Sequence, residues 1–369
     1  MDRWARRDAP FHSEPLQPAS PADCAAFAAQ AAEVFEHIAG DAVVAMDMSL
    51  DAQGQFVDAR TGAPIQAVAE EYSRMKYGDL DAVDVFAGHI AVAAMESARF
   101  LQFNRDAIAN ERVISITTAG VFNVPSASNL LLRAVAGRLN LLLSRLGLAP
   151  LIVAEMTRLS DNALGYPSAW VRDRRSEVAG GRGLTIVPDQ FREQCVIFMD
   201  DLFNTGLTIA RAAARLQIAG AADTMYLFAA RMDPEVVGAT AGRVEDLLND
   251  AFISGTLASV APMLQYGRFT VVQKLLGIVL NPCWSADLAA FLPEMPTASL
   301  LQLVVAASSD GYRHRRQGAF LPSLLKLEAE LEKRGALDAT GHITGAASVL
   351  AVDHQGHSTI EMAPSKPRI

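Results

Sequence analysis

The sequence predicts an α/β protein: a parallel sheet flanked by helices, with an N-terminal α+β portion and a helical C-terminal region. Between residues 105 and 235, short β-branched runs alternate with helical patterns, and this order is typical of a parallel sheet covered on both faces. The run CVIFM at 195–199 is apolar without alternation, as in a strand buried on both faces. Beyond Asp233 only helical patterns follow.

Length and composition indicate a globular protein. The chain has 369 residues, of which 51% are hydrophobic and 20% charged, which is enough for two domains or one elaborated domain. No run approaches the roughly 18 uninterrupted apolar residues of a membrane span, and the N-terminus lacks the apolar segment of a secretory signal. We therefore expect a cytoplasmic protein with no membrane partner.

Charge and cysteines exclude two further classes. The net charge of -9 argues against extended contact with polyanions, so we expect no nucleic-acid partner. The three cysteines are far apart and odd in number, which supports neither a disulfide framework nor a zinc site. They are Cys24, Cys195 and Cys283.

The N-terminal part divides into a loose arm, 1–21, rich in Pro, Ser and charge, and an α+β portion, 22–104. Helical and alternating patterns give the elements of the second part. They are a helix at 24–38, two short strands around the Gln-Gly turn in 42–58, and helices at 65–78 and 82–101. We expect this portion to lie on the acceptor side of any active site.

The central part, 105–235, carries the predicted parallel sheet. The expected strands are 112–120, 149–156, 183–187, 195–201 and 224–233, and the expected helices are 129–147 and 205–220. The C-terminal part, 236–369, is expected to be mainly helical, to cover the site as a hood, and to end in a polar tail. Its expected helices are 244–253, 271–280, 286–292, 299–308 and 322–335.

An acid pair and a small-residue turn mark the candidate site. Asp200 and Asp201 end the strand at 195–201, and the segment NTGLT, 204–208, leads from them into a helix. Ligands of open α/β sheets bind beyond the carboxyl ends of the strands. The turn offers backbone amides, two threonine hydroxyls and the positive end of a helix dipole, which favour a phosphate. A ribose 5-phosphate suits both the acid pair and the turn, because its hydroxyls can donate to the carboxylates and its phosphate can accept hydrogen bonds from the amides.

The residues alone leave three interpretations open. The first is a sugar-phosphate or nucleotide site. The second is another magnesium-carboxylate site, as in a phosphatase or a Walker B acid, although no Gly-Lys-Ser/Thr segment of a Walker A partner is present. The third is a structural strand end without an active site.

The stretch VIFMDDLFNTGLT, 196–208, resembles the signature of type I phosphoribosyltransferases, which bind 5-phosphoribosyl 1-pyrophosphate (PRPP). Asn204 departs mildly from it, since a small hydroxyl residue or Ala is commoner there. The resemblance implies a type I phosphoribosyltransferase-like sheet in which Asp200 and Asp201 hold the ribose 2- and 3-hydroxyls. It further implies a 5-phosphate site formed by Asn204, Thr205, Gly206, Leu207 and Thr208.

The resemblance extends to the loop after the strand at 112–117. In the family this loop binds the diphosphate through backbone amides, and the residues that match are Thr118, Ala119, Gly120 and Val121. It lacks the Lys or Arg found in several members, so the diphosphate would need charge from elsewhere. An ordinary strand-to-helix turn is the alternative interpretation.

Two basic features lie outside these loops. Residues 157–183 match the long loop that closes over the substrate in the family, and Arg158 and Arg174 are its catalytic candidates for neutralising the diphosphate, with a solvated surface as the alternative. Lys76, in the string KYGD at 76–79, could reach a phosphate or the acceptor. A surface lysine at a helix end is the interpretation that we favour for it.

The resemblance implies transfer of the 5-phosphoribosyl group from PRPP to an unidentified small-molecule acceptor, with release of pyrophosphate. Positioning, charge stabilisation and exclusion of water would dominate the catalysis. Mg²⁺ is the expected cofactor, carried mainly by PRPP, with Asp200 or Asp201 as a further ligand. The alternatives are a regulatory protein that binds PRPP or a nucleotide without catalysis, and the reverse cleavage of a ribosyl compound. A homodimer is expected from family habit.

Overall fold

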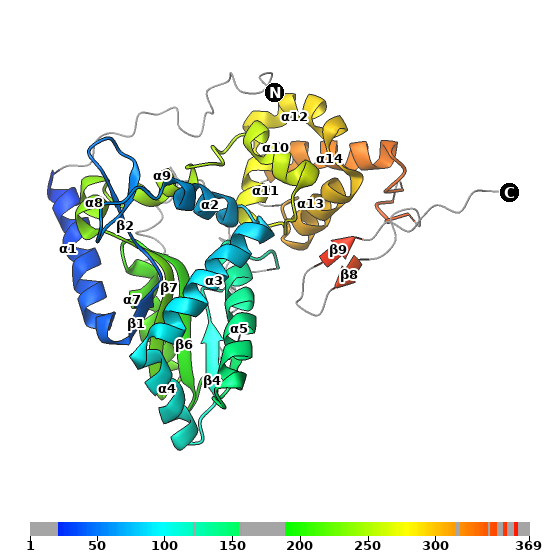
Figure 1. The fold of residues 1–369 in the computed structure, drawn as a ribbon. Coiled ribbons are helices and arrows are strands. Elements are labelled where there is room, and N and C mark those ends of the chain that lie inside the picture. The colour runs from blue at the N-terminus through cyan, green and yellow to red at the C-terminus, as the bar shows by residue number, and fades with distance from the viewer. Residues whose placement is uncertain are drawn as a thin grey trace.

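The computed structural model describes residues 21–120, 123–154, 156, 189–314, 318–338, 340–344, 350–352 and 358–360. Its centre is a mixed seven-stranded sheet (Figure 1), so the predicted α/β class is confirmed. The strands are β1 (Ala42–Val44), β2 (Asp47–Leu50), β3 (Phe56–Asp58), β4 (Ile114–Thr117), β5 (Leu151–Val153), β6 (Cys195–Phe203) and β7 (Asp223–Met232). A small separate pair follows, β8 (Leu350–Val352) with β9 (Ser358–Ile360).

The strand order is β3-β2-β7-β6-β4-β5, with β1 also beside β7. All pairs in this sheet are parallel except the β2–β3 hairpin, which the Gln-Gly turn predicted. The long strand β7 pairs with both β1 and β2 along the same edge. Ala42 of β1 lies opposite Tyr226, and Met48 of β2 lies opposite Met232. The N-terminal portion therefore extends the central sheet.

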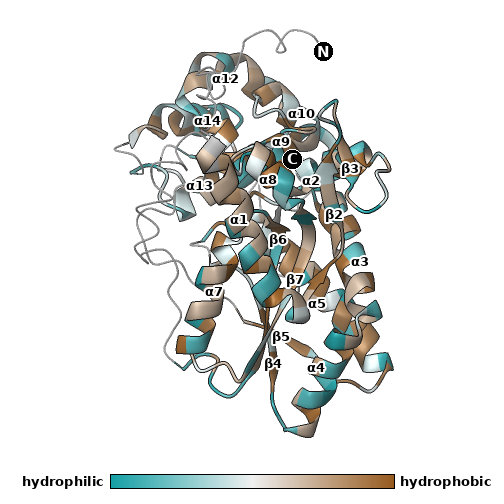
Figure 2. Cartoon of the chain, turned by 90° about the vertical axis from the view of Figure 1, so that its left-hand side faces the viewer, coloured by the Kyte–Doolittle hydropathy of each residue, from teal (hydrophilic) through white to brown (hydrophobic). Residues whose placement is uncertain are grey.

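Helices cover both faces of the sheet. They are α1 (Pro21–Ile38), α2 (Gln66–Lys76), α3 (Leu80–Glu96), α4 (Ala98–Ala109), α5 (Ala127–Arg145) and α7 (Leu207–Ile218). Figure 2 shows α1 and α7 on one side of the sheet and α3, α4 and α5 on the other. Side chains of β6 alternate accordingly: Phe198 packs in the cluster of α7, and Ile197 in the cluster of α3 and α5.

The C-terminal region is helical, as predicted, with α8 and α10 in addition to the expected helices. Its helices are α8 (Pro234–Ala239), α9 (Val244–Asn249), α10 (Leu257–Tyr266), α11 (Gln273–Val279), α12 (Ser285–Phe291), α13 (Thr297–Ser309) and α14 (Leu321–Lys333). Leu227 of β7 and Leu303 of α13 belong to one continuous apolar cluster. Of the expected arm at 1–21, only Pro21 is described, and it begins α1. The rest of the arm, the expected strand at 183–187 and the end of the tail lie outside the described residues.

One described stretch, Gln273–Glu294, has the length and apolar composition of a membrane span. It consists of α11, α12 and two 3-10 turns, Pro282–Trp284 and Leu292–Glu294, and more than half of it is buried inside the protein. Core helices of folded domains share these properties.

Candidate functional site

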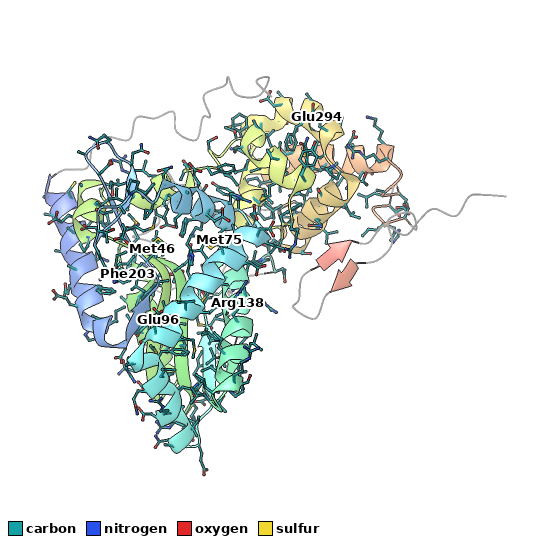
Figure 3. All side chains as sticks on the ribbon, in the orientation of Figure 1. Met46, Met75, Glu96, Arg138, Phe203 and Glu294 are labelled. Carbon is teal, nitrogen blue, oxygen red and sulfur yellow. The ribbon has the colours of Figure 1, made fainter. Side chains whose placement is uncertain are left out.

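The candidate site lies where the carboxyl ends of β4 and β6 meet α2 and the start of α5. In Figure 1 the parallel strands point toward α2 and the C-terminal helices. Figure 3 shows that side chains fill the space under α2, where Met75 is labelled and completely buried. The acid pair follows the apolar run as expected, but β6 continues to Phe203, so the pair lies within the strand and Asp201 is two residues before its end.

Three donors surround the carboxylate of Asp201. The hydroxyl of Tyr72 and the ammonium of Lys76 each donate to Oδ2 at 2.5 Å, and the hydroxyl of Ser128 donates to Oδ1 at 2.8 Å. Two of these donors come from α2 and one from the second residue of α5. Asp201 therefore joins β6 to both helices through charge-assisted hydrogen bonds.

Asp200 has a different environment. Its Oδ1 accepts the backbone amide of Asp201 at 3.0 Å and lies 3.3 Å from the hydroxyl of Ser128. Its side chain also shares a hydrogen bond with the side chain of Asp201. Burial, and then the charge on Asp201, raise the pKa of Asp200 well above its ordinary value.

The pKa of Asp201 moves in the opposite direction. Burial opposes its ionisation, but the charge of Lys76 and the hydrogen bonds from Lys76 and Tyr72 outweigh burial and lower its pKa below the ordinary value. Burial also opposes the charge on Lys76, and Asp201 reverses this effect and raises the pKa of the lysine. In the free protein the acid pair thus holds one negative charge and one proton.

The interpretation of Lys76 as a surface lysine is wrong. Its side chain is only 11% exposed and forms ion pairs with Asp201 and, at 3.4 Å, with Glu245. The spacing of Ala69, Tyr72 and Lys76 places the lysine on the face of α2 that the first two residues bury. That spacing was readable in the sequence, whereas the carboxylate that receives the lysine was not.

The turn after the acid pair leads into α7 as expected. Gly206 has a left-handed backbone, with φ of 74°, and precedes the first turn of α7, for which no side-chain cap is formed. A Cβ at this glycine would lie 2.8 Å from the side chain of Val34, so only glycine fits. Of the other predicted phosphate-binding residues, Thr205 and Leu207 are half-buried and Thr208 is exposed.

Asn204, the departure from the signature, has a structural role. Its Nδ2 donates to the carbonyl of Gly242 at 2.9 Å and ties the turn to the segment between α8 and α9. Its Oδ1 is buried, and no described residue forms a hydrogen bond to it. A buried acceptor without a partner is costly, so this oxygen is a candidate contact for a ligand.

The end of β4 offers further unsatisfied groups. The hydroxyls of Thr117 and Thr118 are buried and have no partner among the described residues, and the chain continues through half-buried Ala119 and buried Gly120. The loop is anchored farther on, because Oδ1 of Asp310, just after α13, accepts two backbone amides, those of Asn123 at 2.8 Å and Val124 at 2.9 Å. Val121, Arg158 and Arg174 lie outside the described residues.

Ser128 and Lys274 are candidate site residues that sequence reasoning missed. Ser128 lies directly before the predicted helix at 129–147, and Lys274 lies in an apolar C-terminal segment. Nothing local marks either of them as part of the site, because tertiary contacts bring them there. Ser128 reaches the acid pair directly, and Lys274 is close enough to Lys76 and Asp201 for their charges to act on it.

Fold and site together define an α/β protein with a buried acid pair at the end of a parallel strand. No cluster of three or more metal-binding side chains is found among the described residues. No family model matches the chain, and neither a curated protein nor a solved structure was found to match it.

Proposed function

We propose that the protein is a PRPP-dependent phosphoribosyltransferase with a type I phosphoribosyltransferase-like core. The observation that carries the proposal is the continuity of the site: the buried acid pair of β6 leads through left-handed Gly206 directly into the uncapped start of α7. Carboxylates and a helix N-terminus at this spacing match the two ends of a ribose 5-phosphate.

Each part of PRPP has a place in the proposal. The 5-phosphate would accept hydrogen bonds from the amides at the start of α7, and the ribose hydroxyls would donate to Asp200 and Asp201. The diphosphate would lie against the chain that follows β4, at Thr118, Ala119 and Gly120. The unpaired hydroxyls of Thr117 and Thr118 support this placement, since a ligand would satisfy them.

A Mg²⁺ ion fits these residues as a companion of the diphosphate. Both oxygens of Asp201 already accept hydrogen bonds from Tyr72, Lys76 and Ser128, so Asp200, once it has lost its proton, is the carboxylate of the pair that could serve as a ligand. One carboxylate oxygen plus phosphate oxygens and water is an ordinary Mg²⁺ environment. When bound, the ion would neutralise charge on the departing pyrophosphate.

The test is titration calorimetry of the protein with PRPP, with and without Mg²⁺. We expect micromolar affinity that requires Mg²⁺ and is lost in Asp200→Asn, which removes the ionisable carboxyl group but retains the shape of the side chain. Ser144→Ala is the matched control, because its hydroxyl bonds only within α5, to the carbonyl of Leu141. PRPP binding that is absent from the wild-type protein, or unchanged in Asp200→Asn, would refute the site assignment.

Turnover separates the proposed enzyme from the regulatory alternative. Pyrophosphate release from PRPP on addition of small-molecule extracts supports transfer to an acceptor, whereas tight binding without release supports a regulatory protein. The homodimer and the cytoplasmic location belong to the same proposal. Light scattering of the purified protein measures the first, and microscopy of a fluorescent fusion measures the second.

A further inference from the structure

The first turn of α11 lies beside the candidate site. Gly78, just after α2, contacts the segment before α11: its carbonyl accepts the amide of Thr270 at 2.9 Å. The amide of Gln273, the first residue of α11, donates to the carbonyl of Pro125 at 3.2 Å, two residues before α5 begins. The helical C-terminal region thus reaches the loop that precedes Ser128.

Lys274 has no carboxylate partner in the part of the chain that the structure describes. Its ammonium lies 5.7 Å from the centroid of the Tyr77 ring, and the charged groups that act on it are Lys76 of α2, Asp201 of β6, and Glu245 and Asp246 of α9. Burial first, and then the like charge of Lys76, lower the pKa of Lys274 to about 8. A half-buried ammonium without an ion pair is costly to the folded protein.

Gln273, next to this lysine, presents a second unsatisfied donor. The residue is 6% exposed, and its Nε2 has no hydrogen-bond partner in the described ranges of the chain. Buried amide donors are nearly always paired in native proteins. Two adjacent residues at the start of α11 therefore offer hydrogen-bond donors that the protein itself leaves unused.

The remaining charges favour a negative ligand. Asp201 is already neutralised by Lys76 at 2.5 Å, and the neutral form of Asp200 is favoured by burial. Glu245 forms an ion pair with Lys76, at 3.4 Å. A phosphate or carboxylate would complete the set, because these anions accept several charge-assisted hydrogen bonds at once.

We propose that Lys274 and Gln273 of α11, together with Lys76 of α2, form an anion-binding subsite beside the acid pair, which takes a phosphate or carboxylate group of a substrate. Only the identity of that substrate rests on the proposed function. The group belongs either to the diphosphate of PRPP or to an acidic acceptor. The first source would supply the positive charge that the 118–120 loop lacks, and the second would make the C-terminal region the acceptor side.

Calorimetry with inorganic pyrophosphate tests the subsite. Lys274→Met should lower the affinity at pH 7 by at least about tenfold, because a charge-assisted hydrogen bond is lost. Lys274→Arg should retain most of the affinity, and Gln273→Leu should show a smaller loss. Lys333→Met, which removes an exposed lysine of α14 paired with Glu330, is the control and should change nothing. Methionine at 274 removes an unpaired charge, so the variant is expected to fold.

Two further titrations distinguish the sources. Ribose 5-phosphate should bind wild type and Lys274→Met equally, because it engages the acid pair and α7. Protein saturated with PRPP and Mg²⁺ is then titrated with inorganic phosphate: a remaining site that depends on Lys274 identifies an acidic acceptor, and its absence identifies the diphosphate. If Lys274→Met changes neither pyrophosphate nor phosphate binding, the subsite is overturned, even where PRPP still binds.

Discussion

Asp200 and Asp201 are adjacent in the sequence, but their carboxyl groups differ in hydrogen bonding and in pKa. Asp201 accepts three hydrogen bonds and is held ionised by Lys76, while Asp200 is buried beside that charge and favours its proton. Two like charges at adjacent strand positions cannot both ionise cheaply in a buried site. The pair is therefore prepared to give up one proton when a ligand or a cation enters.

This difference predicts unequal stability effects for two similar substitutions. Asp201→Asn leaves the buried charge of Lys76 without its main partner and should lower the free energy of unfolding by about 3–5 kcal/mol. Asp200→Asn replaces a neutral carboxyl by a neutral amide and should change it by no more than about 1 kcal/mol. Urea denaturation measures both values. Adding Lys76→Met to Asp201→Asn should restore part of the loss, and an equal cost for the two single variants would contradict the charge assignment.

Lys274 predicts how anion binding depends on pH. Because its pKa is lowered to about 8, the fraction of charged lysine falls as the pH rises through 8, and the affinity for pyrophosphate should fall with it. An anion stabilises the charged form, so binding above pH 8 should also take up a proton. Calorimetry in buffers of different ionisation enthalpy measures the uptake. Lys274→Arg remains charged and should lose this pH dependence between pH 7 and 9.

At the scale of elements, a backbone contact sets the position of α11 against α2. Gly78 has φ of 94°, and a Cβ there would collide with the carbonyl oxygen of Thr270. The two segments also form a bridge between Asp79 and Phe269. The side-chain carboxylate of Asp79 caps α3 by accepting hydrogen bonds from the backbone amides of Asp81 and Ala82. The turn at Gly78 and Asp79 thus ends α2, begins α3 and contacts the C-terminal helical region.

Gly78→Ala should therefore destabilise the protein by at least about 2 kcal/mol, because alanine is strained at this φ and meets a backbone atom. Gly137→Ala is the matched control: it lies within α5, and a Cβ there meets no atom within 4 Å. Alanine at that position should be neutral or stabilising by roughly 0.5–1 kcal/mol. Thermal unfolding compares the two variants. A tolerated Gly78→Ala would show that α2 and the Thr270 segment are not in tight contact.

Local patterns predicted most of the elements, and tertiary contacts decided the rest. Helices such as α1 and α5 and the strands β4, β6 and β7 follow from their apolar periods. Asp200 and Asp201 were found because both the strand end and the turn are local in sequence. Lys76 was misjudged because its partner Asp201 is far away in the sequence, and Lys274 was missed because only folding brings it beside Tyr77 and Lys76. Local sequence patterns likewise could not predict that β1 and β2 both pair with β7.

The whole molecule has one apolar core on the α3 side of the sheet. It runs from β7 and α5 into α11, α13 and α14. Asp310 adds a polar link by binding the backbone after β4. The C-terminal region therefore covers apolar surface of the central part and anchors a loop of the candidate site. Each part would expose apolar side chains without the other.

Such a shared core predicts a single cooperative unfolding transition. Trp284 is buried in the C-terminal region, and Trp4→Phe with Trp170→Phe leaves it as the only tryptophan of the three in the sequence. Its fluorescence and the circular dichroism at 222 nm should then give the same midpoint in urea. A Trp284 transition at clearly lower urea would mean that the helical region unfolds independently.

The position of β1 and β2 has a consequence for how the protein is made. Both strands belong to the first 50 residues, yet they pair with β7, which ends at Met232. A ribosome must therefore synthesise more than half of the chain before this edge of the sheet can close. Until then the N-terminal strands and α1 expose apolar side chains with no native partner, a state that favours slow folding and makes chaperones useful.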